Sequence, residues 1–321
     1  MPPWREAIRS PPLSVRPLLI GTRGSPLALW QARHVAARLR AAHALAEDAI
    51  ALEAITTSGD RISDKPLRDF GGKGLFTKEI DEALLEGRVD LAVHSMKDLP
   101  SLLPEGLMVG AVLPRADVRD AFISTKAASL AALPPGAVIG TSSLRRAAQL
   151  RRRRPDLRVV DFRGNVETRL KKLGEGRADA TLLALAGLER LGLAAHATAI
   201  FSTDEMLPAA GQGAIGVTCR TDDQATRARL DALNDLAAAT AVACERAFLA
   251  RLDGSCKTPI AGYAEIENGR LRFRGLILTP DGSRWFETEL TGSADRAEGL
   301  GTEAANALRE CAGPDFIASL G

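Results

Sequence analysis

Short apolar runs alternate with helical patterns through the first 235 residues of the chain. After the run at residues 18–20, the apolar spacing predicts a helix over residues 27–41, with Ser25 as its cap and Pro26 at its first position. Strands that alternate with helices are typical of a mostly parallel sheet covered by helices. Further strands are predicted at residues 50–55, 91–93, 108–113, 138–139, 158–160, 181–185 and 214–218.

Two short motifs occur twice in the chain, in the same order. Gly21-Thr22 and Gly140-Thr141 each stand between an apolar run and a predicted helix. EGRVD at residues 86–90 and EGRAD at residues 175–179 each precede a predicted strand. The repeat predicts two similar α/β lobes, which generally bind a ligand in the crevice at the carboxyl ends of their strands.

The pattern changes after Asp235. An alanine-rich helix is predicted over residues 237–252 and a second helix over residues 294–311, with Asp281-Gly282 as a hairpin turn between strands. This order predicts a small α+β domain with a helix at each end. Its strands are predicted at residues 260–266, 271–278 and 285–290.

Composition narrows the class of protein. The 321 residues are 45% hydrophobic, which is enough for two or three domains with proper cores. A net charge of only +2, with three Trp, one Tyr and nine Phe, argues against a nucleic-acid-binding protein. The proline-rich residues 1–17 predict a disordered extension without a signal peptide, and no apolar run is as long as a membrane span. We therefore expect a soluble, cytoplasmic protein.

The four cysteines, Cys219, Cys244, Cys256 and Cys311, lie far apart in the sequence. This spacing argues against a disulfide framework and a structural zinc site, and no metal is expected. Cys256 stands in a glycine-containing loop beside Lys257, where a cation favours the nucleophilic thiolate; an ordinary small residue in a turn is the alternative. A cysteine protease is disfavoured because none of the four histidines stands in a recognisable catalytic setting.

Arginines recur at likely helix starts between Gly140 and Arg169. Arg145 with Arg146, then Arg163, then Arg169 each follow a short apolar run. A helix N-terminus offers free backbone N–H groups, and the planar arginine fork binds a carboxylate or phosphate through two bonds. The segment therefore predicts a site for a ligand that carries several anionic groups.

Two further segments point to chemistry in the crevice. HSMKD at residues 94–98 ends a predicted strand, so Asp98 could act as a general acid or hold developing positive charge; a solvated turn is the alternative. FGGKGLF at residues 70–76 lacks the Gly-Lys-Ser/Thr ending of a Walker A sequence. With Ser58-Gly59-Asp60 upstream, it predicts a long, mobile loop that covers the active site.

Taken together, these segments closely resemble the porphobilinogen deaminase family of tetrapyrrole biosynthesis. The resemblance runs from about residue 20 to about residue 280, and its specificity comes from the order of the motifs. The matching motifs are TRGSPLALWQ at residues 22–31, GGKGLF at 71–76, HSMKD at 94–98, GTSSLRR at 140–146, RGNV at 163–166, PAAGQG at 208–213 and the Cys256 loop.

The resemblance implies an α/β protein with two lobes like the halves of periplasmic binding proteins and a small α+β C-terminal domain that carries the cysteine. The first lobe is expected to be discontinuous, because the return segment near residues 214–218 would belong to it. The implied boundaries are residues 18–113 and 214–231 for lobe 1, 119–207 for lobe 2 and 236–321 for the third domain.

The resemblance also implies an activity, that of a monomeric hydroxymethylbilane synthase. A dipyrromethane cofactor, built from the enzyme's own substrate, is implied on Cys256 through a thioether. Four porphobilinogen units are then added, each with loss of ammonia, before a linear tetrapyrrole is hydrolysed off. Asp98 is the implied catalytic residue, which contacts pyrrole N–H groups, assists ammonia loss and stabilises the cationic azafulvene intermediate. No nucleic-acid or membrane partner is expected.

Since every pyrrole ring carries an acetate and a propionate, the resemblance implies many carboxylate-binding residues. Residues 58–75 form the implied lid, with Lys73 near a carboxylate and Phe76 against a pyrrole ring. Some relatives have a basic residue directly before the Gly-Gly-Lys-Gly segment or one position earlier, where this chain reads Arg68-Asp69-Phe70. The implied cofactor-binding residues are Cys256, Lys97, Arg145, Arg146, Ser143 and Arg190, and the implied substrate-binding residues are Arg23, Ser25, Lys73, Phe76, Arg163, Asn165, Arg169 and Gln212.

Two other classes of protein stay open as alternatives. A non-catalytic, two-lobed anion-binding protein explains the repeat and the arginines, but it explains neither Cys256 nor Asp98 nor the third domain, and it would normally carry an export signal. A nucleic-acid-binding protein is disfavoured by the balanced charge and the few aromatic residues. Consumption of porphobilinogen distinguishes the enzyme from both.

Overall fold

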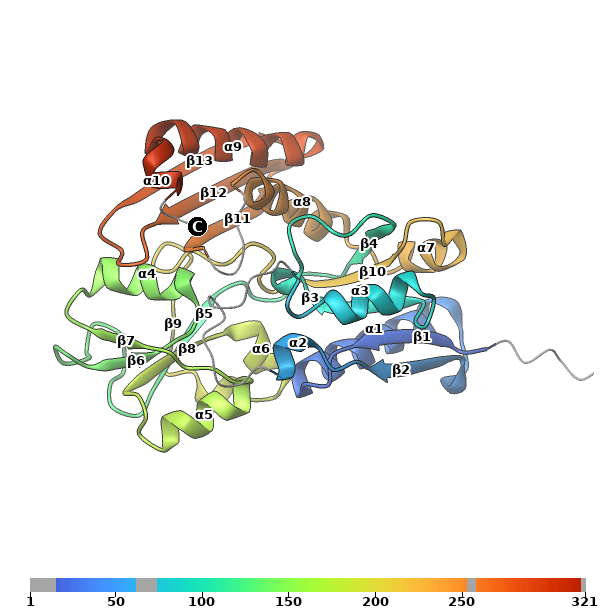
Figure 1. The fold of residues 1–321 in the computed structure, drawn as a ribbon, viewed down its shortest axis with the longest axis horizontal. Helices are drawn as coiled ribbons and strands as arrows, with labels where there is room; N and C mark the ends of the chain where they lie inside the picture. Colours follow the sequence, from blue (N-terminus) through green and yellow to red (C-terminus); the bar gives the residue numbers. More distant parts are fainter. Residues whose placement is uncertain (1–15, 62–73, 253–257, 319–321) are drawn as a thin grey trace, which may run out of the picture.

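The computed structural model describes residues 16–61, 74–252 and 258–318, and it contains three β-sheets (Figure 1). Two five-stranded sheets lie beside each other in the lower part of Figure 1, one mainly in blue and cyan with β10 in yellow-orange and the other mainly in green. The three-stranded sheet lies above them, in orange and red. The predicted α/β class, with two lobes and a small α+β domain at the C-terminal end, is confirmed.

The N-terminal lobe contains the first sheet and the helices that cover it. Its elements are β1 (Leu18–Thr22), α1 (Pro26–His43), η1 (Glu47–Ala49), β2 (Ile50–Ala54), α2 (Ser58–Arg61), α3 (Lys78–Leu85), β3 (Leu91–Ser95), η3 (Met96–Asp98), β4 (Leu107–Val112), β10 (Ile215–Arg220) and α7 (Gln224–Asp231). The strand order is β2-β1-β3-β10-β4, and only β10 runs against its neighbours. Val35 and Leu39 of α1 pack on one face of the sheet, and Ile80 and Leu84 of α3 pack on the other, so both faces are buried.

The second lobe has the same layout. Its elements are β5 (Asp120–Ser124), β6 (Val138–Gly140), α4 (Leu144–Arg153), β7 (Arg158–Val160), α5 (Val166–Gly174), β8 (Ala180–Ala184), α6 (Leu185–Arg190), η4 (Ala194–His196) and β9 (Ala199–Ile200). The strand order is β7-β6-β8-β5-β9, and only β5 runs against its neighbours. Leu150 of α4 packs on one face and Leu173 of α5 on the other.

The two lobes confirm the internal repeat that the sequence predicts. The EGRxD motif before β3 and β8 has the same structural role in each lobe. The Asp90 carboxylate accepts from the Leu19 backbone N–H at 2.8 Å, and the Asp179 carboxylate accepts from the Val138 N–H at 2.7 Å. Each aspartate thereby ties the start of a central strand to the strand beside it.

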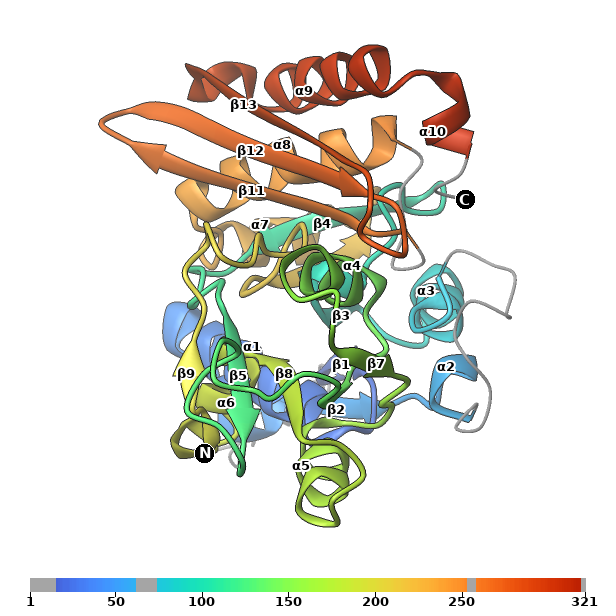
Figure 2. The same cartoon turned by 90° about the vertical axis from the view of Figure 1, so that its left-hand side faces the viewer.

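The third domain contains α8 (Leu236–Arg251), β11 (Ile260–Glu267), β12 (Arg270–Leu278), β13 (Trp285–Ser293), η5 (Ala294–Arg296), α9 (Ala297–Ala312) and α10 (Pro314–Ala318). Helices α8 and α9 cover one face of its sheet through a core that includes Phe248 and Phe273. Gly301 permits their close crossing, because a Cβ atom there would lie 2.1 Å from the carbonyl oxygen of Cys244. The other face packs Leu276 against Ala148 of α4, which lies between this domain and the second lobe in both views (Figures 1 and 2).

One buried carboxylate joins the third domain to both chain segments that cross between the lobes, residues 113–119 and 201–214. Glu245 of α8 is fully buried. Its oxygens accept from Arg115 Nη1 and Nη2 at 2.7 and 3.0 Å, from the Gly211 N–H at 2.6 Å and from the Ala264 N–H of β11 at 2.8 Å. With its acceptor sites filled, a buried carboxylate fixes the geometry of the groups around it.

The sequence pattern misses two strands, β5 and β9. β5 has only three apolar residues between Asp120 and Ser124, and β9 has two residues, so neither gives a recognisable run. The helix predicted over residues 294–311 begins as the 3-10 turn η5 and continues as α9. None of the described helices is both long enough and apolar enough to cross a membrane.

Candidate active site

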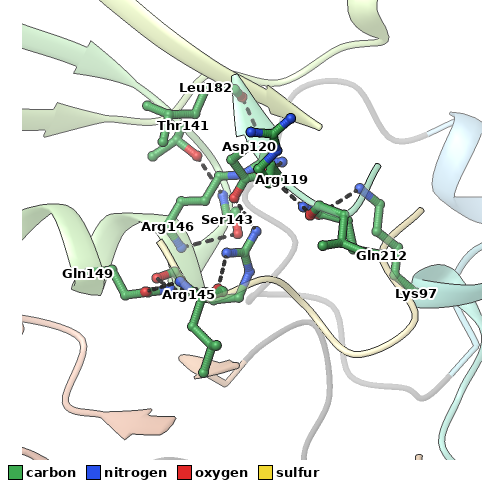
Figure 3. Close-up of polar contacts among 12 residues, drawn as sticks. Lys97, Arg119, Asp120, Thr141, Ser143, Arg145, Arg146, Gln149, Leu182 and Gln212 are labelled. Atoms are coloured by element: carbon green, nitrogen blue, oxygen red, sulfur yellow. Dashed lines mark hydrogen bonds and ion pairs between the residues drawn. The ribbon is translucent and has the colours of Figure 1, made fainter. Parts of the chain in front are cut away.

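Most of the predicted site residues come together where the two lobes face each other. Lys97 and Asp98 lie in η3, directly after β3, and Arg145 and Arg146 lie in the first turn of α4, after β6. Asp120, the first residue of β5, lies at the centre of the polar contacts in Figure 3. The site is therefore built at strand ends, as expected for paired α/β lobes.

Asp120 is fully buried and binds both arginines. Its Oδ2 accepts from Arg145 Nη2 at 2.8 Å, and its Oδ1 accepts from Arg146 Nη2 at 2.7 Å (Figure 3). The other Nη group of each guanidinium donates to a backbone carbonyl. Arg145 Nη1 donates to the Leu207 carbonyl at 2.7 Å, and Arg146 Nη1 donates to the Leu182 carbonyl at 3.0 Å. Burial alone would raise the pKa of Asp120, but the two guanidiniums outweigh it and hold the pKa far below its usual range.

Gln212 connects this ion pair to Lys97. Its Nε2 donates to Asp120 Oδ1 at 2.8 Å and to the Val118 carbonyl at 2.7 Å, and its Oε1 accepts from Lys97 Nζ at 3.4 Å (Figure 3). Burial, assisted by the charge of Arg146, lowers the pKa of Lys97 to about 8. A bound anion would favour the charged ammonium and raise that pKa again.

Asp98 lies exposed within electrostatic range of Lys97 and Arg169. Burial and the charge of Arg146 lower the pKa of Arg169 to about 10, while Asp98 opposes that shift. Arg169 uses its Nε to donate to the Gly164 carbonyl at 2.7 Å. Within the described part of the chain, neither of its Nη groups has a hydrogen-bond partner, so this end of the guanidinium is available to an anion.

A pocket of about 60 Å³ in the first lobe is lined by Asp98 together with Arg23, Phe76 and His94. The Arg23 guanidinium stacks on the Phe76 ring, 4.3 Å from its centre. Burial lowers the pKa of His94 to about 4, and its Nε2 lies 3.1 Å from Thr218 Oγ1. Because His94 is neutral at physiological pH, Asp98 is the lining residue suited to offset positive charge.

Three of the predicted binding residues are helix caps in the structure. Ser25, Ser143 and Asn165 cap α1, α4 and α5. Each side-chain oxygen accepts from the backbone N–H three residues on, at 3.4 Å for both serines and 2.8 Å for the asparagine. Their polar atoms thus fix the helix starts that carry or follow the predicted arginines.

Arg190 forms its described contacts away from the Asp120 ion pair. Its Nη2 donates to the Gly213 carbonyl at 2.7 Å, and its guanidinium lies 5.9 Å from the centre of the Trp30 ring. Burial lowers its pKa to about 10. Arg163 stands just before α5, where its carbonyl accepts from Lys172 Nζ at 3.0 Å.

Several predicted residues lie outside the described part of the chain. These are Cys256, Lys73 and Arg68, with most of the predicted lid over residues 58–75. Among the described residues, no group of three or more His, Cys, Asp or Glu is arranged to hold a metal ion.

Sequence reasoning missed two carboxylates, Asp120 and Asp60. Asp120 follows Val118-Arg119 and precedes only three apolar residues, so it resembles a turn residue. An acidic residue directly before an apolar run, in a chain whose helix starts carry arginines, is the signal that could have identified it. Asp60 stands in a segment that the glycine pattern assigns to a loop.

These features define a class of protein: two α/β lobes with a cluster of cationic side chains at their strand ends, joined to an α+β domain. The family model described as "Porphobilinogen deaminase, dipyromethane cofactor binding domain" matches residues 18–228, and that described as "Porphobilinogen deaminase, C-terminal domain" matches residues 239–310. The chain belongs to the porphobilinogen deaminase family, as the sequence resemblance implies.

Individual relatives agree with this membership. A "Porphobilinogen deaminase" of Paracoccus denitrificans is 57% identical over 94% of this chain and 96% of its own length. A "Porphobilinogen deaminase, chloroplastic" of Oryza sativa subsp. japonica is 56% identical over 94% of this chain and 86% of its own length. Among solved structures, a periplasmic substrate-binding protein of an ABC transporter from Coxiella burnetii has a TM-score of 0.42 and 16% identity, over 71% of this chain and 96% of that one.

The surroundings of Lys97 generate a prediction about its titration. With its pKa at about 8, the folded protein releases this proton in a pH range where an unfolded chain still holds it, since a free lysine titrates near ~10.4. The free energy of unfolding should therefore rise with pH between about 8 and about 10. In protein without a bound anion, such as Cys256→Ser, ¹⁵N NMR of the Lys97 ammonium should give a midpoint near pH 8, and adding Arg146→Gln should shift that midpoint upward. A midpoint at the ordinary value for lysine would contradict the description of the site.

Proposed function

We propose that this chain is a hydroxymethylbilane synthase, which joins four porphobilinogen units head to tail with loss of ammonia and releases the linear tetrapyrrole by hydrolysis. The observation that carries the proposal is the grouping of Asp98 with Lys97 and Arg169, both of which also lie within electrostatic range of Arg146, in a chain that belongs to the porphobilinogen deaminase family. The products belong to the tetrapyrrole and heme pathway.

The described residues fit a dipyrromethane cofactor. Each pyrrole ring of the family's substrate carries two carboxylates, so the cofactor needs several cations. The four cations Lys97, Arg145, Arg146 and Arg169 face the carboxylates of Asp98 and Asp120, and Asp161 also acts on Arg169, so a net positive charge of one remains. The Arg146 Nε is buried and has no hydrogen-bond partner among the described residues, so one donor still requires an acceptor.

We propose that Lys97, Arg145, Arg146, Ser143 and Arg190 hold the cofactor, which is attached to Cys256. When bound, the dipyrromethane supplies the pyrrole carbon to which the first substrate unit is joined. Asp120 neutralises one of the two positive charges of Arg145 and Arg146. Its hydrogen bonds also fix the orientation of both guanidiniums, so that they are already placed to bind cofactor carboxylates. The role of Cys256 rests on the sequence motif alone.

The proposed substrate-binding residues lie in both lobes. In the first lobe, Phe76 offers a ring face and Arg23 a charged group in the pocket beside Asp98. In the second lobe, Arg169 offers an open guanidinium end. The full proposed set is Arg23, Ser25, Lys73, Phe76, Arg163, Asn165, Arg169 and Gln212.

Asp98 is the proposed catalytic residue. The amino group of the substrate's aminomethyl substituent leaves as ammonia, the methylene carbon stays on the pyrrole, and positive charge develops on that methylene-pyrrole unit. Among several cations this charge would be strongly opposed, and an exposed carboxylate beside Lys97 and Arg169 offsets it. The Asp98 oxygens can also accept the pyrrole N–H, which orients the ring for the next bond.

We further propose that the protein works as a cytoplasmic monomer without nucleic-acid or membrane partners. The near-balanced net charge of +2 argues against a nucleic-acid partner. We propose lobe boundaries at residues 18–113 with 214–231, at 119–207 and at 236–321, with residues 1–17 as an extension.

The intact mass of the purified protein tests the function directly. We expect a mass above 34.0 kDa by a two-pyrrole adduct, which maps to the peptide that contains Cys256, and consumption of added porphobilinogen. Cys256→Ser should lack both the adduct and the activity. Cys311→Ser is the matched control, because Cys311 is exposed on α9, and it should keep both. An unmodified protein that binds porphobilinogen without consuming it would favour the non-catalytic anion-binding alternative.

The charge of Asp98 is tested by Asp98→Asn, which keeps the size of the side chain. Turnover should fall by at least ~10²-fold, the usual scale for loss of an acid–base or charge-stabilising group. Intact mass should be recorded on the same samples, so that the rate refers to protein that carries the adduct. Near-normal turnover by such protein would rule out the catalytic role.

A further inference from the structure

Arg23 is held in place by two groups from the segment that precedes α3. The Asp60 carboxylate accepts hydrogen bonds from Arg23 Nε, at 3.1 Å to Oδ1 and 3.2 Å to Oδ2. It also accepts a hydrogen bond from Arg23 Nη2. The Phe76 ring covers the guanidinium plane, with its centre 4.3 Å from Arg23 Cζ. The ion pair fixes the rotation of the guanidinium, and the ring fixes its plane.

Asp60 is itself anchored. Its Oδ2 accepts from the Thr57 backbone N–H at 3.2 Å and from Thr57 Oγ1 at 2.8 Å, and Thr57 is fully buried. Burial alone would raise the pKa of Asp60, but the bonds from Arg23 and Thr57 outweigh it and lower the pKa below its usual range. Asp60 is therefore ionised at neutral pH and cannot rotate without losing these bonds.

The ring is anchored to the same short helix. A Cβ atom on Gly59 would lie 2.3 Å from the Phe76 ring, so only glycine allows this approach. The Gly59 N–H donates to the Leu75 carbonyl at 2.9 Å, and the Ser58 N–H donates to Glu79 Oε1 at 2.9 Å. Helix α2 and the start of α3 thus form one unit around Arg23.

The arrangement leaves one end of Arg23 open. A guanidinium can bind a carboxylate along its Nε–Nη2 side or across its two Nη groups. Asp60 takes the first, while Nη1 has no hydrogen-bond partner among residues 16–61, 74–252 and 258–318. Arg23 also lines the pocket that contains Asp98.

We propose that Asp60 is a positioning residue for substrate binding: it locks the side of Arg23 so that the open Nη end meets a substrate carboxylate beside Asp98. The proposal rests on the proposed function for the identity of that carboxylate. Asp60 lowers the affinity through its negative charge, but it removes the rotational freedom that a mobile arginine would lose on binding. The alternative is a competing carboxylate, which occupies Arg23 until the substrate displaces it.

Asp60→Ala, measured on adduct-bearing protein with porphobilinogen, distinguishes the two roles. We expect KM to rise about tenfold with kcat within about twofold, because a ground-state contact is weakened. Asp60→Asn should recover part of the loss, since the amide oxygen still accepts one bond from Arg23. Thr57→Val, which removes one bond to Asp60 and keeps the shape, should raise KM by a smaller factor.

The matched control is Asp156→Ala. Asp156 binds Arg154 Nε and Nη2 at 2.8 and 2.6 Å in the same side-on geometry, at an exposed position of the second lobe. Its KM and kcat should equal those of the wild type. A fall in KM for Asp60→Ala would establish competition, and an unchanged KM would show that Asp60 does not act through Arg23; either result overturns the proposal.

A measurement without substrate separates this proposal from the function. The ¹H–¹⁵N signal of Arg23 Nε, assigned by its loss in Arg23→Lys, should be protected from solvent exchange in the wild type, weakened in Asp60→Asn and absent in Asp60→Ala. Protection in a wild type that does not consume porphobilinogen would support the lock and reject the proposed reaction. A fast-exchanging Arg23 Nε in the wild type would overturn the lock, whatever the turnover.

Discussion

The site depends on one buried ion pair, in which the Asp120 carboxylate is shared by Arg145 and Arg146. Two guanidiniums side by side in a buried helix start would repel each other and would lack acceptors. Asp120 accepts a hydrogen bond from one Nη group of each arginine, and a backbone carbonyl accepts one from the other Nη group of each. One positive charge remains from the three groups, and its direction is fixed. Removing one partner of such a buried pair typically lowers the free energy of unfolding by about 3–5 kcal/mol, so the three side chains are held in one arrangement.

The same ion pair is connected to the joint between the domains. Gln212 donates from its side chain to Asp120, while its carbonyl accepts from Arg115 Nε at 3.0 Å. Arg115 in turn binds the buried Glu245, which holds the third domain. The position of the third domain and the direction of the cationic groups therefore depend on a continuous set of hydrogen bonds through the crossing segments.

Much of this architecture follows from local sequence pattern. The alternation of strands and helices, the EGRxD repeat and the arginines at helix starts predict two lobes with a cationic crevice, and Ser25 is recognisable as a cap. Asp120 is not predictable in this way, because its role depends on pairing between β5 and a strand far along the chain. The role of Asp60 is not predictable for a related reason, because its partner Arg23 lies 37 residues away in the sequence. The capping roles of Ser143 and Asn165 follow ordinary N-cap preferences, but motif resemblance directs attention to ligands instead.

The most direct test of the account is the cofactor content of Asp120→Asn. Asparagine keeps the shape of the side chain and removes the charge that holds Arg145 and Arg146 together. Asp117→Asn is the matched control three residues away, because Asp117 pairs with the half-exposed Arg119. The account predicts that Asp120→Asn melts at a lower temperature and is mostly without the two-pyrrole adduct by intact mass, while Asp117→Asn resembles the wild type. An Asp120→Asn protein with the adduct content and melting temperature of the wild type would contradict the account.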